Sequence, residues 1–177
     1  MNTEIIFEDN SWMECCRDDI NTAAEAVFAQ LNLKHDDVEI CFLCTNDESV
    51  RILNKTYRGV DRPTNVLSFP ADSYDDEDSS CTCEANTSCD CKICNCKDDK
   101  PPCLLGSVAF AFETIRDESM NQNKSFDDHL KHLVVHSVLH LLGYDHIDDE
   151  DAKKMEELET KILSNMGVND PYDSEML

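Results

Sequence analysis

The segment HLKHLVVHSVLHLLGYDH, residues 129–146, combines an apolar helical pattern with five of the chain's six histidines. Ser125-Phe-Asp-Asp128 just upstream has the form of a capping box, which predicts a helix start. Gly143 is expected to end the helix, because a residue in the left-handed conformation commonly closes one. The sequence therefore predicts a largely apolar helix over residues 125–142 that carries several imidazoles.

Strands and helices alternate on both sides of this helix. Period-two alternation predicts strands, and capping residues followed by apolar periodicity predict helices. The expected strands are 3–8, 37–44, 65–69 and 104–112, and the expected helices are 11–31, 46–57, 113–120, 125–142 and 148–166. We therefore expect a single α+β domain in which a small mixed four-stranded sheet packs with about five helices.

Composition separates two segments from this domain. Residues 71–103 are acidic and rich in cysteine and have almost no bulky apolar side chains, so they cannot build a core of their own. We interpret them as an insertion within one domain of 177 residues. The polar residues 168–177 are expected to form a loose tail.

Charge and cysteine usage exclude several classes of protein. A net charge of −23 rules out broad electrostatic attraction to nucleic acid or anionic lipid. No apolar run approaches the length of a membrane span, and the N-terminus lacks the pattern of a secretory signal. We therefore expect a cytoplasmic protein whose 11 cysteines are free thiols or metal ligands rather than disulfides.

Three histidines have the spacing of a metal site. His136 and His140 share one helix face, and His146 follows the break at Gly143, so all three can converge. Three neutral imidazoles with an open fourth position are typical of catalytic zinc, one ion per chain. His132, one turn earlier, is expected to touch a ligand or substrate instead of the metal. His129 and His35 look like surface residues.

A basic cluster lies upstream of the third expected strand. Lys55, Arg58 and Arg62 fall within eight residues, and Arg51 precedes them by one helical turn. Arginine can hold a phosphate through two parallel hydrogen bonds, and Gly59 lets the backbone approach a ligand closely. Pairing with surface carboxylates is the alternative, and it remains open for Arg62; for Arg58 we favour a functional role.

Together, HLVVHSVLHLLGYDH and YRGVDRPTNVLSFP resemble the YbeY family of metal-dependent single-strand endoribonucleases. The resemblance covers the chain except the insertion and the tail. It implies zinc on His136, His140 and His146 and a functional Arg58. It also implies a role in ribosomal RNA maturation, notably at the 3′ end of the small-subunit (16S) RNA, and in ribosome quality control. The implied partners are ribosomal RNA and the ribosome or its proteins; neither DNA nor a membrane is expected.

Three positions depart from the family pattern. Asn65 and Ser107 replace the usual aspartates, and Ser137 replaces a glycine. Asn65 and Ser107 are both expected near a cleft between the histidine helix and the third expected strand.

The metzincin peptidase pattern H-E-x-x-H-x-x-G-x-x-H also shares the histidine spacing, but Ser137 stands where its general base would be. No general base is evident, and Asp145 is expected to contact a histidine ligand. A metallohydrolase acting on another substrate and a non-catalytic ribosome assembly factor with a structural metal remain alternatives.

The insertion carries its own candidate metal site. Its Cys-x-Cys and Cys-x2-Cys spacings allow pairs of thiolates to reach one soft ion. The candidate ligands for zinc or another thiophilic metal are Cys81, Cys83, Cys89, Cys91, Cys94 and Cys96. The alternative is a disordered acidic loop with reduced thiols.

Overall fold

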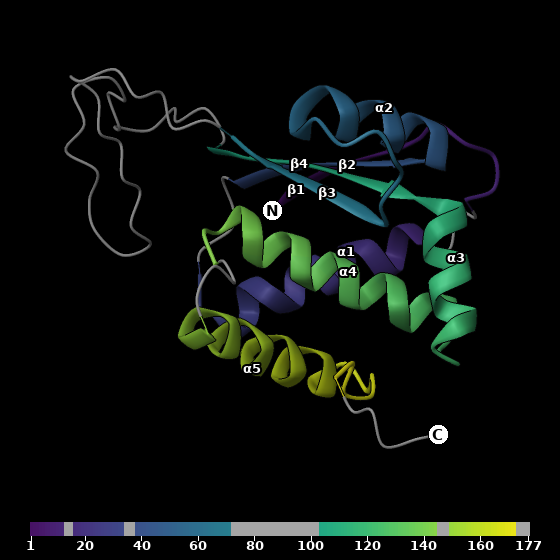
Figure 1. Cartoon of the computed structure of the whole chain (residues 1–177). Helices are drawn as coiled ribbons and strands as arrows, with labels where there is room; N and C mark the ends of the chain where they lie inside the picture. Colours follow the sequence, from purple (N-terminus) through teal and green to yellow (C-terminus); the bar gives the residue numbers. More distant parts are fainter. Residues whose placement is uncertain (13–15, 34–37, 72–102, 145–148, 173–177) are drawn as a thin grey trace, which may run out of the picture.

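In the described part of the chain, four strands form one mixed sheet in the order β1–β2–β4–β3 (Figure 1). The computed structural model describes residues 1–12, 16–33, 38–71, 103–144 and 149–172. The strands are β1 (Asn2–Phe7), β2 (Val38–Thr45), β3 (Val66–Pro70) and β4 (Cys103–Ala111). β1 and β4 run parallel to β2, whereas β3 runs antiparallel to β4 and forms an edge of the sheet. The predicted mixed sheet is confirmed.

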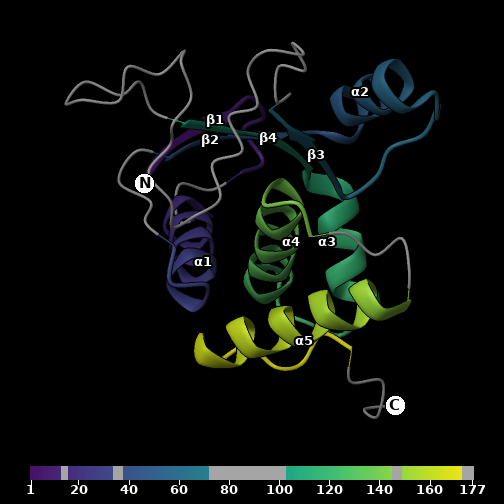
Figure 2. The same cartoon turned by 90° about the vertical axis from the view of Figure 1, so that its left-hand side faces the viewer.

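Five helices cover this sheet unequally. They are α1 (Cys16–Gln30), α2 (Asp47–Arg58), α3 (Phe112–Asn121), α4 (Phe126–Leu141) and α5 (Asp149–Asn165). Figure 2 shows α2 alone on one face and α1 and α4 side by side on the other, with α5 beneath them. The α+β class expected from the sequence is confirmed. Among the described helices, none is both long enough and apolar enough to cross a bilayer.

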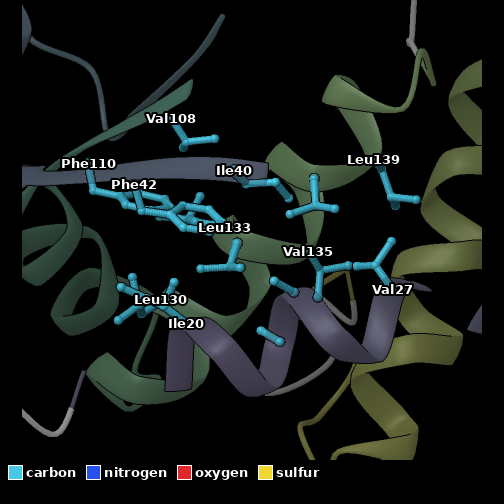
Figure 3. Close-up of a cluster of buried hydrophobic side chains, with 14 of the residues drawn as sticks. Ile20, Val27, Ile40, Phe42, Val108, Phe110, Leu130, Leu133, Val135 and Leu139 are labelled. Carbon is cyan, nitrogen blue, oxygen red and sulfur yellow. The ribbon is translucent and has the colours of Figure 1, made fainter. Parts of the chain in front are cut away.

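The main core lies between the sheet and the pair α1 and α4 (Figure 3). Successive residues of a strand face opposite sides, so β4 directs Val108 and Phe110 into this core and Ala109 and Ala111 toward α2. The large side chains thus fill the core between the sheet and the pair α1 and α4. The small alanines let α2 pack closely on the other face.

Local capping explains where two of the helices begin. The side chains of Asn46 and Ser125 accept hydrogen bonds from the backbone N–H groups of Ser49 (2.9 Å) and Asp128 (3.0 Å), as predicted. α1 begins at Cys16, later than expected. A helix begins where a capping side chain accepts hydrogen bonds from the first backbone N–H groups, which have no partner within the helix.

A glycine ends α4 and redirects the chain. Gly143 has φ +88°, and the following N–H of Tyr144 donates to the carbonyl of Leu139 at 3.0 Å. This is the left-handed helix ending that the sequence predicts. It brings residues 143 and 144 back beside the last turn of α4.

Part of the expected loose tail packs against the domain. Val168 is buried in the main core, and the Tyr172 hydroxyl donates to Glu159 of α5. The carbonyl of Pro171 accepts a hydrogen bond from the Lys124 side chain. Residues 168–172 therefore differ from the expectation, because one apolar and one phenolic side chain reach buried partners.

Gly106 lies at a bulge in the pairing of β2 with β4, and it allows β3 to approach β4 closely. The register between β2 and β4 shifts here, since Glu39 pairs with Leu104 and Ile40 with Gly106. Gly106 has φ +150°, and a Cβ atom would collide with the carbonyl oxygen of Phe69 and lie 2.8 Å from Leu141 Cδ2. Only glycine fits this position without a shift of the sheet or of α4.

We expect Gly106→Ala to lower the free energy of unfolding by about 2–4 kcal/mol, through backbone strain and overpacking. Urea denaturation at pH 7 measures the loss. Gly59→Ala is the matched control, because Gly59 has φ +71° but open space around its missing Cβ. Its loss is expected to be only about 1 kcal/mol. Equal losses in the two variants would contradict the close approach at Gly106.

Candidate active site

Two histidines of α4 present the same ring atom to each other. His136 and His140 are one turn apart, and their Nε2 atoms lie 3.1 Å apart. The two rings are nearly perpendicular, with centroids 4.5 Å apart. The helix spacing predicted that these side chains share a face, and the structure brings their Nε2 atoms together.

The histidine pair lies in a cleft of about 610 Å³ between α4 and the edge strand β3. The end of α2, the start of β3 and the turn after α4 complete its wall. The lining residues are Arg58, Asn65, Val66, Ser68, Pro70, His136, His140, Gly143 and Tyr144. A cleft of this size can enclose a ligand comparable to a nucleotide.

Among the described residues that line this cleft, Arg58 is the one with a positively charged side chain. Its neighbours in the basic cluster are neutralised locally: Asp61 binds both Arg51 and Lys55, and Glu48 binds Arg51 at 2.8 Å. Within the described ranges, Arg58 forms no ion pair, although the chain is strongly acidic. Its guanidinium is therefore available to an anionic ligand.

Arg62 does not join Arg58 in the cleft. Its side chain is exposed and is absent from the cleft wall, while its backbone carbonyl accepts a hydrogen bond from Asn54 at 2.8 Å. No ion pair to Arg62 occurs among the residues that the structure describes. The pairing with surface carboxylates that the sequence left open for Arg62 is thus not observed there.

A buried carboxylate behind the histidines was not anticipated from the sequence. Glu159 of α5 is fully buried, and its Oε1 lies 2.7 Å from His136 Nδ1. Its Oε2 contacts His132 Nε2 at 3.3 Å and accepts the Tyr172 hydroxyl. Burial opposes ionisation of Glu159, but hydrogen bonds from His132 and His136 outweigh it and lower its pKa to about 2.

One sequence signal points to Glu159. It occupies the inward face of α5 together with Met155, Ile162 and Leu163, all of which are buried. An acidic residue at an apolar position of an amphipathic helix implies a buried partner. His132 contacts this carboxylate, so it lies beside the histidine pair and one turn away from it.

Glu118 of α3 supports Asn65 at the cleft wall. Asn65 Nδ2 donates to Glu118 Oε2 at 2.9 Å, and the Asn65 side-chain oxygen accepts the N–H of Val66 at 2.7 Å. The amide therefore has a donor facing a carboxylate and an acceptor facing an N–H. An aspartate at this position would place a second negative charge against Glu118.

His129 differs from the expected surface residue. It is 3% exposed, and its Nε2 lies 2.9 Å from the same Glu118 oxygen. Burial lowers the pKa of His129, against the opposing effect of the hydrogen bond to Glu118. The neutral ring donates from Nε2, and its buried Nδ1 has no partner among the described residues. The sequence could not show this, because Glu118 lies on another helix.

The other two departures from the family pattern lie away from the cleft. Ser107 pairs with Phe69 in register, so both face α2 on the opposite side of the sheet from the histidines. The expectation that Ser107 lies near the cleft is therefore wrong. Ser137 is fully buried, and its hydroxyl donates to the carbonyl of Leu133 at 2.7 Å. Neither serine can act on a ligand in the cleft.

Several predicted site residues lie outside the described residues. These are His146, Asp145, Cys81, Cys83, Cys89, Cys91, Cys94 and Cys96. Within the described ranges, no group of three or more histidine, cysteine or acidic side chains is arranged to hold a metal ion. Cys41 and Cys44, which are described, are free thiols, and burial raises the pKa of Cys44 to about 12.

The histidine pair itself fits a metal of the zinc type. Two imidazole nitrogens on a tetrahedral zinc lie about 3.3 Å apart, given Zn–N bonds of about 2.0–2.1 Å. The observed separation of 3.1 Å between the Nε2 atoms is close to this value. The third predicted ligand, His146, follows two residues after Tyr144 of the cleft wall.

A comparison with solved structures places the fold. The solution structure of TM1509 from Thermotoga maritima matches with a TM-score of 0.52 at 21% identity, covering 98% of this chain and 97% of that one. The two proteins share the small α+β fold with a mixed four-stranded sheet.

Sequence comparison defines the family. A model described as "Endoribonuclease YbeY" matches residues 4–167. Proteins named Endoribonuclease YbeY include one from Bradyrhizobium sp., 40% identical over 172 residues, 96% of this chain and 91% of its own length. The protein of that name from Paramagnetospirillum magneticum is 44% identical over 149 residues, 84% of this chain and 80% of its own length. The chain belongs to the YbeY endoribonuclease family, which confirms the resemblance.

We expect Asn65→Asp to destabilise the protein at pH 7 by about 1–2 kcal/mol, because two carboxylates would face each other across the present 2.9 Å contact. Like charge raises the pKa of such a pair, so the deficit should shrink as the pH falls toward 5. Urea unfolding at both pH values measures this. In Asn65→Ala, which adds no charge, the deficit should not change with pH. A variant Asn65→Asp as stable as wild type at pH 7 would contradict the assigned contact.

Proposed function

We propose that this chain is a metal-dependent hydrolase that cleaves single-stranded RNA. Its proposed role is ribosomal RNA maturation, at the 3′ end of the small-subunit RNA, and ribosome quality control in the cytoplasm. Family membership supports the endoribonuclease activity. The observation that carries the proposal is the meeting of an arginine without an ion pair and two convergent imidazoles in one cleft.

The proposed metal ligands are His136, His140 and His146. A zinc ion bound there would supply a Lewis acid and a water that ionises near neutral pH. The protein's own contribution is to hold both described imidazoles on one rigid helix, which limits their movement. Arg58 would bind the scissile phosphate through two parallel hydrogen bonds and stabilise the negative charge that develops on it.

The rest of the surface does not favour RNA. The net charge of −23 repels a polyanion, and the ion pairs of Arg51 and Lys55 reduce the positive charge near the cleft. Binding through a few local contacts would be weak and sensitive to salt. We therefore propose that the ribosome or a ribosomal protein delivers the RNA.

The peptidase alternative is weakened by the position of Ser137. The metzincin pattern requires a carboxylate there as general base. The Ser137 hydroxyl is instead buried and bonded to the helix backbone. The phosphates of an RNA substrate can bind the guanidinium of Arg58, whereas a peptide backbone has no such anionic group.

We expect Arg58→Glu to slow cleavage of a single-stranded RNA oligonucleotide by at least about 100-fold, because it replaces the phosphate-binding cation with an anion. His140→Ala should abolish cleavage and remove one zinc per chain. His140 is chosen because its loss leaves the contacts of Glu159 in place. Cleavage rates, metal content and circular dichroism are measured together.

Arg116→Glu is the control for charge reversal. Arg116 is a partly exposed arginine of α3 that pairs with Asp117 and lies outside the cleft wall. The Arg116→Glu variant should cleave the RNA at a rate within twofold of the wild-type rate. Full activity of both Arg58→Glu and His140→Ala would contradict the proposed site. A wild-type chain that binds zinc but cuts no RNA would favour the non-catalytic assembly factor.

We further propose that the cysteines of the insertion bind zinc or another thiophilic metal. The support is their spacing, because the Cys-x-Cys and Cys-x2-Cys arrangements among residues 81–96 let two thiolates reach one soft ion. Metal binding would then supply folding energy to a segment without an apolar core.

Replacing residues 72–101 with a short Gly-Ser linker tests this second metal site. The deletion is compatible with the fold, because Ala71 N–H donates to the Leu105 carbonyl at 3.0 Å and the two ends are adjacent. We expect metal content to fall to the single ion of the histidine site, measured by elemental analysis. Unchanged metal content would show that the insertion binds none.

A further inference from the structure

A buried charge lies on the side of α4 that faces away from the sheet. Glu159 is fully buried where α5 packs beneath α4 (Figure 2). A carboxylate in such a place is stable only if hydrogen-bond donors replace the water it has lost. The residues that donate these hydrogen bonds therefore indicate the role of Glu159.

All three donors belong to the surroundings of the histidine pair. They are His136 Nδ1 at 2.7 Å, His132 Nε2 at 3.3 Å and the Tyr172 hydroxyl. An ionised carboxylate can only accept hydrogen bonds, so each partner must direct a proton toward it. Glu159 thereby holds a proton on Nδ1 of His136 and on Nε2 of His132.

The consequence for His136 concerns its other nitrogen. A neutral imidazole with its proton on Nδ1 has a lone pair on Nε2. Nε2 is the atom that faces His140 in the cleft, and the 3.1 Å contact then takes its proton from Nε2 of His140. Without the carboxylate, His136 could carry its proton on Nε2 and would then be unable to bind a cation through that atom.

Tyr172 closes the network from the segment after α5. Its ring packs edge-on against His132 with centroids 5.8 Å apart, and its hydroxyl donates to the Glu159 oxygen that His132 also contacts. The Lys124 side chain holds this segment through the Pro171 carbonyl at 2.9 Å. The segment after α5 thus contacts both the carboxylate and His132.

We propose that Glu159 is a positioning residue for the metal site. It orients His136, selects the tautomer whose Nε2 lone pair faces the cleft, and supplies negative charge close to the bound cation. Tyr172 positions Glu159 in turn. This inference rests on the proposed metal-dependent function and assigns a role within it to two residues outside the cleft. Carboxylate partners of histidine ligands typically raise metal affinity about 10–100-fold.

Glu159→Gln in the full-length chain is the direct test. The amide has nearly the same shape but only one acceptor oxygen for three donors, and it lacks the charge. We expect the Zn²⁺ dissociation constant, measured by competition with a chelator, to rise about 10–100-fold. In metal-free protein, the imidazole ¹⁵N shifts should show His136 protonated on Nδ1 in wild type and largely on Nε2 in the variant.

Two further variants separate positioning from general stability. Glu157→Gln makes the same charge change on an exposed face of α5 and should bind Zn²⁺ as wild type does. Tyr172→Phe removes only the hydroxyl and should give a smaller loss of affinity than Glu159→Gln. A role limited to holding α5 on α4 would lower the melting temperature and leave both the tautomer and the affinity unchanged.

Each result bears on the inference separately from RNA cleavage. Zn²⁺ affinity of Glu159→Gln within twofold of wild type would overturn it, and so would a wild-type His136 protonated on Nε2, even if the variant fails to fold. A wild-type chain that binds no Zn²⁺ would overturn it as well. A wild type that binds Zn²⁺ but cuts no RNA contradicts the proposed nuclease and leaves the role of Glu159 standing.

Discussion

Helix α4 is buried on two sides at once, between the sheet above it and α5 below it (Figure 2). Most helices of a small domain need only one apolar stripe, but a helix in the middle layer must be apolar around most of its circumference. Its side toward the edge strand β3 lines the cleft. The four histidines of α4 accordingly take two kinds of position: His136 and His140 line the cleft, and His129 and His132 contact the carboxylates of Glu118 and Glu159.

This constraint explains which parts of the fold were predictable. Strand alternation, the caps at Asn46 and Ser125 and the ending at Gly143 are local, and all appear where the sequence places them. The histidine pair was predictable for the same reason, because residues four apart on a helix share a face. Arg58 could be identified because it lies beside the glycine that ends α2.

The residues that escaped prediction depend on contacts between distant elements. His129 looks like a surface residue until Glu118 of α3 is placed beside it, and Tyr172 looks like part of a loose tail until Glu159 is placed. Glu159 itself is hidden by composition, since acidic residues are common throughout this chain. Only its alignment with Met155 on the inward face of α5 distinguishes it. Ser107 shows the converse, because a one-residue offset along a strand moves a side chain to the other face.

The adjacent ends of β3 and β4 also determine how this domain can vary. Pro70 pairs with Gly106. The next backbone hydrogen bond, from Ala71 to Leu105, joins the two strands where the connecting segment leaves β3 and enters β4. The strands therefore hold the two ends of any connecting segment together, whatever its length. The entropy of closing a flexible loop grows only with the logarithm of its length, by about 0.6 kcal/mol for each doubling. A hairpin of this kind can acquire a long segment of unrelated composition while the sheet, the histidine helix and the cleft keep their geometry.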